Sequence, residues 1–307
     1  MKIGFIGGGR VVSWQLERIA KYNNLEFGGI YDIDQNIRNT FKEKGLRVFD
    51  SLEKFVKSNI DVISICTPSD SHMSVFLEIS KLCKQGQIIT IERPTFLKVE
   101  DFKVAHEIIE SKKLNVFPVF QNRYNEAVKY AKHLMISKEQ GEFLHGKINL
   151  SWCRPQRYYD QADWRGMWAS DGGSLTNQGI HFIDIARYLC GDIKDASFRM
   201  DRANVSIECE NVAVGSLRTI EGKLISVDIN TVSRPDDHHA EVTLYSSRGF
   251  ISLGGIAANK VMQSTDDYPG NLNEEFPNAY GFGHEKFFLE IEKFMLSGDK
   301  KGILSIM

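Results

Sequence analysis

The stretch Gly4-Phe5-Ile6-Gly7-Gly8-Gly9-Arg10 decides the fold of the first part of the chain. It is a short apolar strand that runs into a glycine turn and then into an amphipathic segment. Gly7 permits the tight turn, and Gly9 lets an anion approach the backbone at the start of a helix, where free N–H groups and the positive dipole end lie. This pattern predicts a dinucleotide site, although a bare glycine triplet also occurs in ordinary strand-to-helix turns. The predicted cofactor contacts in this turn are Gly7, Gly9, Arg10 and Val11.

An acidic residue at the end of the next predicted strand supports this interpretation. Asp32 stands 25 positions after Gly7, where an acidic side chain accepts hydrogen bonds from the adenosine ribose and repels a 2'-phosphate. NAD is therefore favoured over NADP. The alternative role, a helix N-cap, suits Asp34 better than Asp32. Val12, at the third position of the glycine fingerprint, is neither Gly nor Ala, which predicts slightly looser packing of the helix on the strand.

Residues 1–122 alternate short apolar runs with amphipathic stretches, which is typical of a doubly wound parallel sheet with helices on both faces. We therefore predict an α/β fold that begins with a Rossmann domain over residues 1–122. The expected strands are Ile3–Ile6, Leu25–Tyr31, Val62–Cys66, Ile88–Ile91 and Val116–Phe120. The expected helices are Ser13–Tyr22, Asp34–Lys44, Ser51–Ser58, Asp70–Lys84 and Val99–Ser111.

Two strand ends of this domain carry further candidates, because open α/β sheets bind ligands at the carboxyl edge. Thr67 and Pro68 follow one strand, and His72 in the next helix faces either the cofactor or solvent. Glu92-Arg93-Pro94 follows another strand, where we expect a cis proline bond that aims the preceding side chain into the site. The alternative for Arg93 is a surface ion pair. Thr67, Pro68, His72 and Glu92 complete the predicted cofactor contacts.

Residues 123–307 change pattern and predict an α+β domain on a large, mostly antiparallel open sheet. After a helix at Glu126–Ile136, the expected strands include Gly146–Trp152, Val212–Leu217, Leu224–Val232 and Glu241–Tyr245. A long segment, Arg154–Gly191, is dense in Trp, Arg, Gly and Tyr, and loops of that length often serve a site. A second loop is expected at Ser264–Gly283.

A predicted helix over Asn177–Leu189 follows a glycine-rich approach and carries the most informative residues of this domain. Asn177 and His181 are four apart and would share one face of that helix. The alternative is a histidine that merely packs in the core. A zinc site at His181 and Asp184 lacks a third ligand, and His238 and His239 would point to opposite faces of a strand, so no metal is predicted.

Composition excludes several classes of protein. The 307 residues carry 38 Lys+Arg against 40 Asp+Glu, which leaves no overall field for nucleic acid or an anionic membrane. The five cysteines are odd in number and form no C-x-x-C pair, so neither a disulfide framework nor a thiolate zinc site is expected. The start has no signal-peptide pattern and no run is long enough to span a membrane, so a cytoplasmic location is expected.

The chain resembles the Gfo/Idh/MocA family of nucleotide-dependent sugar oxidoreductases over essentially its whole length. Three blocks carry the resemblance: the N-terminal glycine turn, Glu92-Arg93-Pro94 in place of the family's Glu-Lys-Pro, and the segment from Gly172-Gly173 through His181 to Asp184. Trp164-Arg165-Gly166 and the Asn-Gln-Gly-Ile-His run at 177–181 are most similar to the branch that oxidises UDP-N-acetylglucosamine-type sugars, including the uronate, at C3 in bacterial surface-polysaccharide synthesis. Gly281-Phe282-Gly283-His284 resembles a stretch that returns toward the cleft.

The resemblance implies roles for particular residues. His181 matches the family histidine that removes the hydroxyl proton, and imidazole exchanges protons near neutral pH. Arg93 stands where the family has lysine, and a guanidinium can hold an oxygen but cannot take a proton. Asn177 stands where the inositol and glucose branch has Asp. The expected catalytic residues are His181, Arg93 and Asn177, and the expected substrate contacts are Arg123, Arg157, Tyr158, Trp164, Arg165, Asn177 and His284.

The sequence therefore predicts an NAD-dependent dehydrogenase of a small sugar or nucleotide sugar that forms a homodimer or homotetramer. One alternative is a dehydrogenase or reductase of a free sugar or polyol. Another is an NAD-binding sensor or scaffold without turnover, because Arg93 replaces the lysine. Arg154 and Tyr159 join Arg157, Tyr158 and Arg165 as candidates for holding a diphosphate, carboxylate or uracil. Family chains usually continue further beyond Ser297-Gly298-Asp299, so either a truncation or a missing final helix would expose a face of the second domain.

Overall fold

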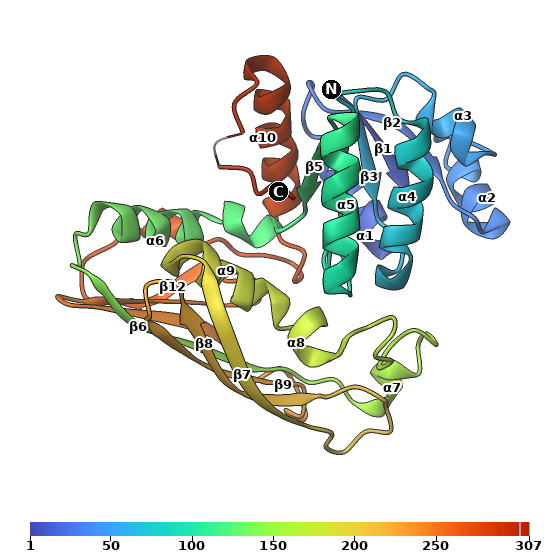
Figure 1. Ribbon diagram of the computed structural model, residues 1–307. Coiled ribbons are helices and arrows are strands. Elements are labelled where there is room, and N and C mark those ends of the chain that lie inside the picture. The colour runs from blue at the N-terminus through green and yellow to red at the C-terminus, as the bar shows by residue number, and fades with distance from the viewer. Residues whose placement is uncertain (301, 307) are drawn as a thin grey trace. The chain divides into compact units, whose positions relative to one another are not determined.

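The computed structural model describes residues 1–300 and 302–306. It consists of two compact units (Figure 1). Unit 1 contains Met1–Val119 and the residues from His284 onward, and unit 2 contains Phe120–Gly283. The predicted boundary at residue 122 lies close to the first crossing between the units. The chain crosses back at residue 284, which the sequence-based division at 123–307 did not anticipate.

Unit 1 is built on the predicted parallel sheet, with strand order β2-β1-β3-β4-β5. Every neighbouring pair in it is parallel, and the order reverses between β1 and β3. Two internal strands, β3 and β4, are buried along their whole length, as expected for strands that are covered on both faces. The strands are β1 (Lys2–Ile6), β2 (Glu26–Tyr31), β3 (Val62–Ile65), β4 (Ile88–Ile91) and β5 (Asn115–Pro118).

Helices cover both faces of this sheet. On one face Phe55, Phe76 and Ile109 pack with Ile63 and Ile89 in a buried apolar cluster. The first helix begins at Arg10, three residues before the predicted start, because Gly9 is its N-cap. The helices are α1 (Arg10–Ile19), α2 (Gln35–Glu43), α3 (Leu52–Val56), α4 (His72–Leu82), α5 (Val99–Lys112) and α10 (Gly283–Ser297), with a 3₁₀ turn at Ser69–Ser71.

Helix α10 is the main correction to the predicted domain division. Phe288 packs edge-on against Phe5 of β1, with ring centroids 6.4 Å apart, and Phe294 packs against Phe117 of β5 at 5.3 Å. Glu285 pairs with Arg18 of α1. Burial of this aromatic stripe against the first sheet explains why the C-terminal helix belongs to unit 1.

Unit 2 contains a seven-stranded sheet with the order β12-β11-β10-β6-β9-β8-β7. All its neighbouring pairs are antiparallel except β6 and β9, which run parallel. This agrees with the predicted open, mostly antiparallel sheet. Strands β7, β11 and β12 are not among the predicted strands. The strands are β6 (Phe143–Ser151), β7 (Ile193–Asp201), β8 (Val212–Thr219), β9 (Leu224–Asn230), β10 (His239–Ser246), β11 (Phe250–Gly254) and β12 (Lys260–Ser264).

The helices of unit 2 pack on one face of its sheet. Ala131 of α6 and Phe182 of α9 lie in the same buried cluster as Ile148, Ile229 and Val242 of the strands. The other face carries exposed apolar side chains, with Val214 50% exposed and Leu224 45% exposed. The helices are α6 (Glu126–Ser137), α7 (Gln156–Tyr159), α8 (Gly173–Asn177) and α9 (Ile180–Cys190), with 3₁₀ turns at Gln121–Tyr124 and Gly270–Leu272.

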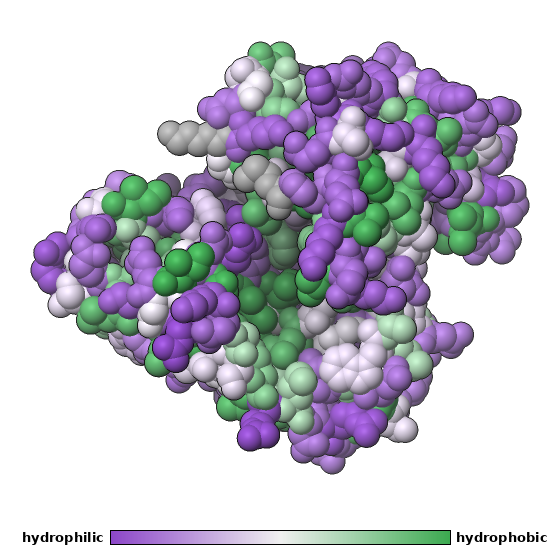
Figure 2. All heavy atoms as spheres, in the orientation of Figure 1, coloured by the Kyte–Doolittle hydropathy of each residue, from purple (hydrophilic) through white to green (hydrophobic). Residues whose placement is uncertain are grey.

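The surface is mainly hydrophilic, which agrees with the charged-residue content of the sequence. Hydrophilic residues dominate the face seen in Figure 2, with apolar residues scattered among them. Within the described residues, no helix is both long and apolar enough to cross a membrane.

Candidate functional site

The glycine turn between β1 and α1 has the geometry that its sequence predicts. Gly7 has a φ of +95°, and a Cβ there would lie 2.7 Å from the Cys66 carbonyl oxygen. Gly9 has ordinary backbone angles, φ −70° and ψ −177°, and a Cβ there would meet no protein atom within 4 Å. Gly7 is therefore required by the fold, whereas the space beside Gly9 is open. That open space fits the predicted close approach of a pyrophosphate.

The start of α1 is suited to an anion. Its N-cap residue makes no side-chain cap hydrogen bond and its first turn contains no acidic residue. Arg10, the first residue of the helix, is exposed, and within the described residues no carboxylate is paired with it. The N–H groups of Arg10 and Val11, the helix dipole and the guanidinium together favour a bound phosphate group.

Asp32 lies beside this turn. Its Oδ2 accepts a hydrogen bond from the Gly8 N–H at 2.7 Å, and its Oδ1 accepts one from the Asp34 N–H at 2.8 Å. Each carboxylate oxygen keeps a second lone pair for a ribose hydroxyl. Asp34 caps α2 by accepting from the Asn36 N–H at 2.8 Å, as the sequence suggested. Arg38, which the sequence analysis did not single out, donates to the backbone carbonyls of Asp32 and Ile33.

His72 is buried, which corrects the expectation that its ring faces the cofactor or solvent. Its Nδ1 lies 2.9 Å from the Pro94 carbonyl and its Nε2 lies 2.9 Å from the Thr67 carbonyl. Burial lowers the pKa of His72, because it outweighs these hydrogen bonds, which raise the pKa. The ring thus joins the loops after β3 and β4, including the Thr67-Pro68 turn, and acts on a ligand only through their backbone.

Glu92, at the end of β4, is the centre of a buried polar cluster. Its Oε1 accepts from Gln15 Nε2 at 2.8 Å and lies 3.2 Å from His284 Nε2, and its Oε2 accepts from the Arg93 N–H at 3.3 Å. Burial raises the pKa of Glu92, but the hydrogen bond and charge of His284 and the charge of Arg93 outweigh burial and lower it. Glu92 therefore fixes the backbone that carries Arg93.

His284 differs from its predicted role as a substrate contact. Its side chain is 1% exposed and lies against Glu92. Its imidazole supports Glu92 at the carboxyl end of β4. The Arg93–Pro94 bond is cis, as predicted, and the Arg93 side chain is half-buried.

The segment with Asn177 and His181 is two helices, where the sequence predicted one. Asn177 is the last residue of α8, and His181 is the second residue of α9. At the break, the Gly179 N–H donates to the Ser174 carbonyl at 2.7 Å. A Cβ at Gly179 would lie 2.6 Å from the side-chain tip of Ile229 of β9, so a larger residue here would displace that side chain. The spacing of four therefore does not place Asn177 and His181 on one helical face.

Two buried carboxylates support this segment. Asp171 is 2% exposed, and it accepts from the Gly166 N–H at 2.7 Å and from the Asn177 side-chain amide. Glu210, 4% exposed, accepts from the Leu175 N–H at 2.9 Å. Burial raises the pKa of Glu210, and the charge of Asp171 adds to that rise against the Leu175 hydrogen bond. Sequence reasoning named neither residue as functional.

Arg123 is engaged within unit 2, which corrects its predicted role as a substrate contact. Its guanidinium forms a two-pronged ion pair with Asp184, with Nε 2.7 Å from Oδ2. The side chains are 11% and 5% exposed. Burial raises the pKa of Asp184, while the hydrogen bond and charge of Arg123 lower it. This pair joins the 3₁₀ turn at Gln121–Tyr124 to α9.

Three of the predicted substrate contacts, Tyr158, Trp164 and Arg165, form with Arg154 and Trp152 a ladder of alternating arginine and aromatic side chains. The Arg154 guanidinium lies 4.9 Å from the ring centre of Trp152 and 5.3 Å from that of Tyr158. The Arg165 guanidinium lies 4.2 Å from the ring centre of Tyr158 and 4.8 Å from that of Trp164. Such stacking occupies the faces of a guanidinium and leaves its N–H edge for planar anions.

The two arginines of the ladder differ in their partners. Arg154 pairs with Asp237 at 3.0 Å. Over the described part of the chain, Arg165 has no carboxylate partner, and its Nε is buried with no hydrogen-bond acceptor. Arg157 is exposed on α7. Arg165 is therefore a stacked, uncompensated cation, which is suited to a carboxylate or phosphate.

Within the described residues, no three His, Cys, Asp or Glu side chains come together in a way that could hold a metal ion. The five cysteines, which all lie within the described residues, form no disulfide bond.

Two family models match the chain. The model described as "Oxidoreductase family, NAD-binding Rossmann fold" matches residues 1–120, and that of the "GFO/IDH/MocA C-terminal domain" matches residues 128–252. Among curated proteins, glucose-6-phosphate 3-dehydrogenase of Bacillus subtilis is 27% identical over 192 residues, which is 61% of this chain but only 53% of that protein. Myo-inositol 2-dehydrogenase of Thermotoga maritima is 23% identical over 98% of this chain and 89% of its own length.

Two solved structures are similar over the whole chain. The WlbA dehydrogenase of Bordetella pertussis, in complex with NADH and UDP-GlcNAcA, has a TM-score of 0.89 and is 26% identical, covering 100% of this chain and 90% of its own. The WlbA protein of Chromobacterium violaceum, with the same two ligands, has a TM-score of 0.87 at 26% identity, covering 100% of this chain and 88% of its own.

Proposed function

The chain belongs to the Gfo/Idh/MocA family of oxidoreductases, and on that premise we propose that it oxidises the C3 hydroxyl of a UDP-N-acetylated hexose or its uronate with NAD as cofactor. The observation that carries this proposal is the similarity, over the whole chain, to two structures that hold NADH and UDP-GlcNAcA. The residues of each unit support it separately.

Unit 1 holds the cofactor. NAD, when bound, supplies the acceptor for a hydride from the sugar carbon. The N–H groups at the start of α1 and the Arg10 guanidinium hold the pyrophosphate, and Gly9 leaves room for it. Asp32, fixed by the Gly8 and Asp34 N–H groups, accepts from the ribose hydroxyls. Its charge opposes a 2'-phosphate.

His181 and Arg93 supply the acid–base and electrostatic parts of the proposed reaction. His181 takes the hydroxyl proton, and the electrons of the O–H bond form the carbonyl. The C–H bond breaks at the same carbon, and its hydride leaves for NAD. Arg93 stabilises the developing alkoxide but takes no proton, because its guanidinium stays charged. Glu92, held by Gln15 and His284, fixes the backbone of Arg93. His181 is then the sole proton acceptor of the pair.

Arg165 selects an anionic substrate. Its guanidinium is oriented by Tyr158 and Trp164 and keeps its charge uncompensated, whereas Arg154 is paired with Asp237. A carboxylate or a phosphate oxygen pair matches the N–H edge of such a guanidinium. This favours a uronate or a nucleoside diphosphate over a neutral free sugar.

We propose that the protein acts as a homo-oligomer through the open face of the unit 2 sheet. Val214 and Leu224 are exposed on that face, and exposed apolar groups on one face of a sheet are typical of subunit contacts.

The test follows the absorbance of reduced nicotinamide when the protein meets NAD+ and a panel of sugars. UDP-N-acetylglucosaminuronate and UDP-N-acetylglucosamine are compared with free glucose, glucose 6-phosphate and myo-inositol. We expect turnover with the UDP sugars that His181→Ala abolishes. Turnover with inositol or glucose 6-phosphate alone would replace this proposal with a dehydrogenase of a polyol or a sugar phosphate, the substrates named for the curated relatives. Tight NAD binding without turnover, restored by Arg93→Lys, would indicate a binding protein.

A further inference from the structure

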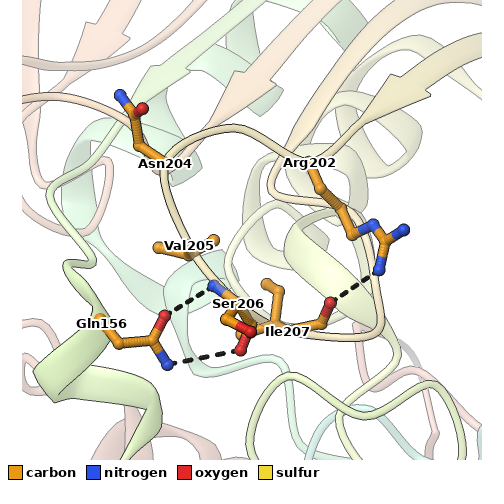
Figure 3. A pocket seen from close by; sticks show the side chains of 6 residues that line it. All are labelled: Gln156, Arg202, Asn204, Val205, Ser206 and Ile207. Carbon is orange, nitrogen blue, oxygen red and sulfur yellow. Dashed lines mark hydrogen bonds between the residues drawn. The ribbon is translucent and has the colours of Figure 1, made fainter.

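The loop between β7 and β8, residues 202–211, reaches the segment that leads to Asn177. The Gly166 carbonyl accepts from the N–H groups of Glu208 at 2.9 Å and Cys209 at 3.0 Å. Further out, the Gln156 side chain accepts from the Ser206 N–H at 2.7 Å, beside a pocket of about 530 Å³ (Figure 3). The loop is therefore fixed to α7 on one side and to Gly166 on the other.

Glu210, near the end of this loop, makes the first-turn contacts of α8. Its Oε1 accepts from the Leu175 N–H at 2.9 Å and from the Ser174 hydroxyl at 3.4 Å, and its backbone carbonyl accepts from the Ser174 N–H at 3.1 Å. Helix α8 has no side-chain cap from Gly172 and no acidic residue in its own first turn. The negative charge that a helix start favours thus comes from a residue that lies 35 positions after Leu175.

Gly173 shows that the segment is shaped around this carboxylate. A Cβ at Gly173 would lie 1.8 Å from Glu210 Oε2, and the residue has a φ of +84°. No side chain other than hydrogen fits between the backbone at 173 and the carboxylate. The Oε2 atom itself is buried and, within the described residues, accepts no hydrogen bond.

The other end of α8 is held by a second buried carboxylate. Asn177 donates its side-chain amide to Asp171, which also accepts from the Gly166 N–H at 2.7 Å. Gly166 thus connects the two supports, because its carbonyl holds the loop that carries Glu210. Helix α8 is five residues long and has little stability of its own. Helix α8 is therefore contacted by a buried carboxylate at each end.

We propose that Glu210 is a positioning residue that sets the start of α8 and thereby the orientation of Asn177 and His181. This inference rests on the proposed role of His181 as the base. Misplacement of a reacting group by about 1 Å can lower a rate by about a hundredfold. Loss of the Glu210 contact therefore lowers kcat and leaves the NAD site of unit 1 unchanged.

The test compares Glu210→Asp, Glu210→Gln and Glu210→Ala with the native protein. The aspartate side chain is one methylene shorter, so its carboxylate no longer reaches the Leu175 N–H. The glutamine side chain keeps an acceptor oxygen at the Oε1 position. We expect Asp and Ala to lower kcat at least about tenfold with the Kd for NADH within about twofold of native. We expect Gln to retain most of the activity. Glu221→Ala removes an exposed carboxylate of the same unit and serves as the control.

A second measurement does not depend on turnover. The imidazole NMR signal of His181, assigned by its loss in His181→Ala, is expected to shift in Glu210→Asp, while the signals of the His residues of unit 1 stay in place. If the native protein has no turnover, the proposed function fails but this shift still tests the positioning. An unmoved His181 signal in Glu210→Asp, native kcat in Glu210→Ala, or loss of NADH affinity in step with kcat overturns the inference. If Glu210→Ala does not fold, the comparison of Glu210→Asp with Glu210→Gln decides whether Glu210 is a positioning residue.

Discussion

Replacing Gly9 with alanine separates cofactor binding from folding. The backbone angles at Gly9, φ −70° and ψ −177°, suit any residue, and the added methyl group would meet no protein atom within 4 Å. Alanine gains about 0.4–1 kcal/mol by restricting the unfolded chain. It loses a similar amount as a poorer N-cap than glycine. The free energy of unfolding should therefore change by less than about 1 kcal/mol.

The effect of Gly9→Ala on NAD affinity should be much larger. A phosphate oxygen that accepts from the N–H groups beyond Gly9 would stand about 3 Å from the backbone, within the space that the methyl group takes. We expect the Kd for NADH to rise at least about a hundredfold, which is about 2.7 kcal/mol. Titration calorimetry measures the affinity, and urea unfolding without cofactor measures the stability.

Gly7→Ala is the matched control. Its φ of +95° and the Cys66 oxygen 2.7 Å from the new Cβ oppose alanine in the fold itself. Left-handed strain of about 1–2 kcal/mol and a comparable overpacking cost predict a loss of about 2–5 kcal/mol in the free energy of unfolding. Native NADH affinity in Gly9→Ala would refute the assignment of this turn to the pyrophosphate. So would a loss of stability in Gly9→Ala as large as that in Gly7→Ala.

Three further predictions concern other residues. Arg165→Gln should raise the KM for UDP-N-acetylglucosaminuronate at least about tenfold, because Arg165 is stacked and half-buried, whereas exposed Arg157 should have a much weaker effect as Arg157→Gln. Equal effects of the two variants in steady-state kinetics would show that the ladder does not bind the anion. Asp184→Asn should lower the free energy of unfolding by about 3 kcal/mol by leaving Arg123 buried without its charge partner, and an unchanged urea midpoint would contradict this. Glu92 has a lowered pKa, so its ionised form stabilises the fold above the ordinary pKa of 4.5, and that contribution is lost as the pH falls through the lower folded-state value. Glu92→Gln should therefore make the free energy of unfolding fall less steeply as the pH is lowered. An equally steep fall in Glu92→Gln and in the native protein would contradict this.

The glycine turn and Asp32 could be predicted because their signals are local. A strand, a left-handed glycine and a helix start lie within ten residues, and the acidic residue follows at the end of the next strand. The cis bond at Pro94 is likewise a property of one short motif. These features depend on backbone geometry that neighbouring residues dictate.

Helix α10 was missed although its signal was present. Phe287, Phe288, Ile291 and Phe294 recur at helical spacing and are buried. That the helix belongs to unit 1 depends on packing against Phe5 and Phe117, which the sequence does not reveal.

The roles of single polar side chains could not be predicted, because their partners lie far away in the chain. His284 meets Glu92 across 192 positions, and Arg154 meets Asp237 across 83. The sequence offered several arginines as equal candidates for an anion. Only the ion pairs of Arg123 and Arg154 leave Arg165 as the uncompensated, stacked one.

An isotope measurement tests most directly whether the protein transfers a hydride from the sugar to NAD. The native protein is incubated with NAD+ and UDP-N-acetylglucosaminuronate that carries deuterium at C3, and the reduced cofactor is analysed by mass spectrometry. We expect reduced cofactor that carries one deuterium per molecule and that is absent with His181→Ala. Reduced cofactor without deuterium, or no reduction by the native protein, would contradict it.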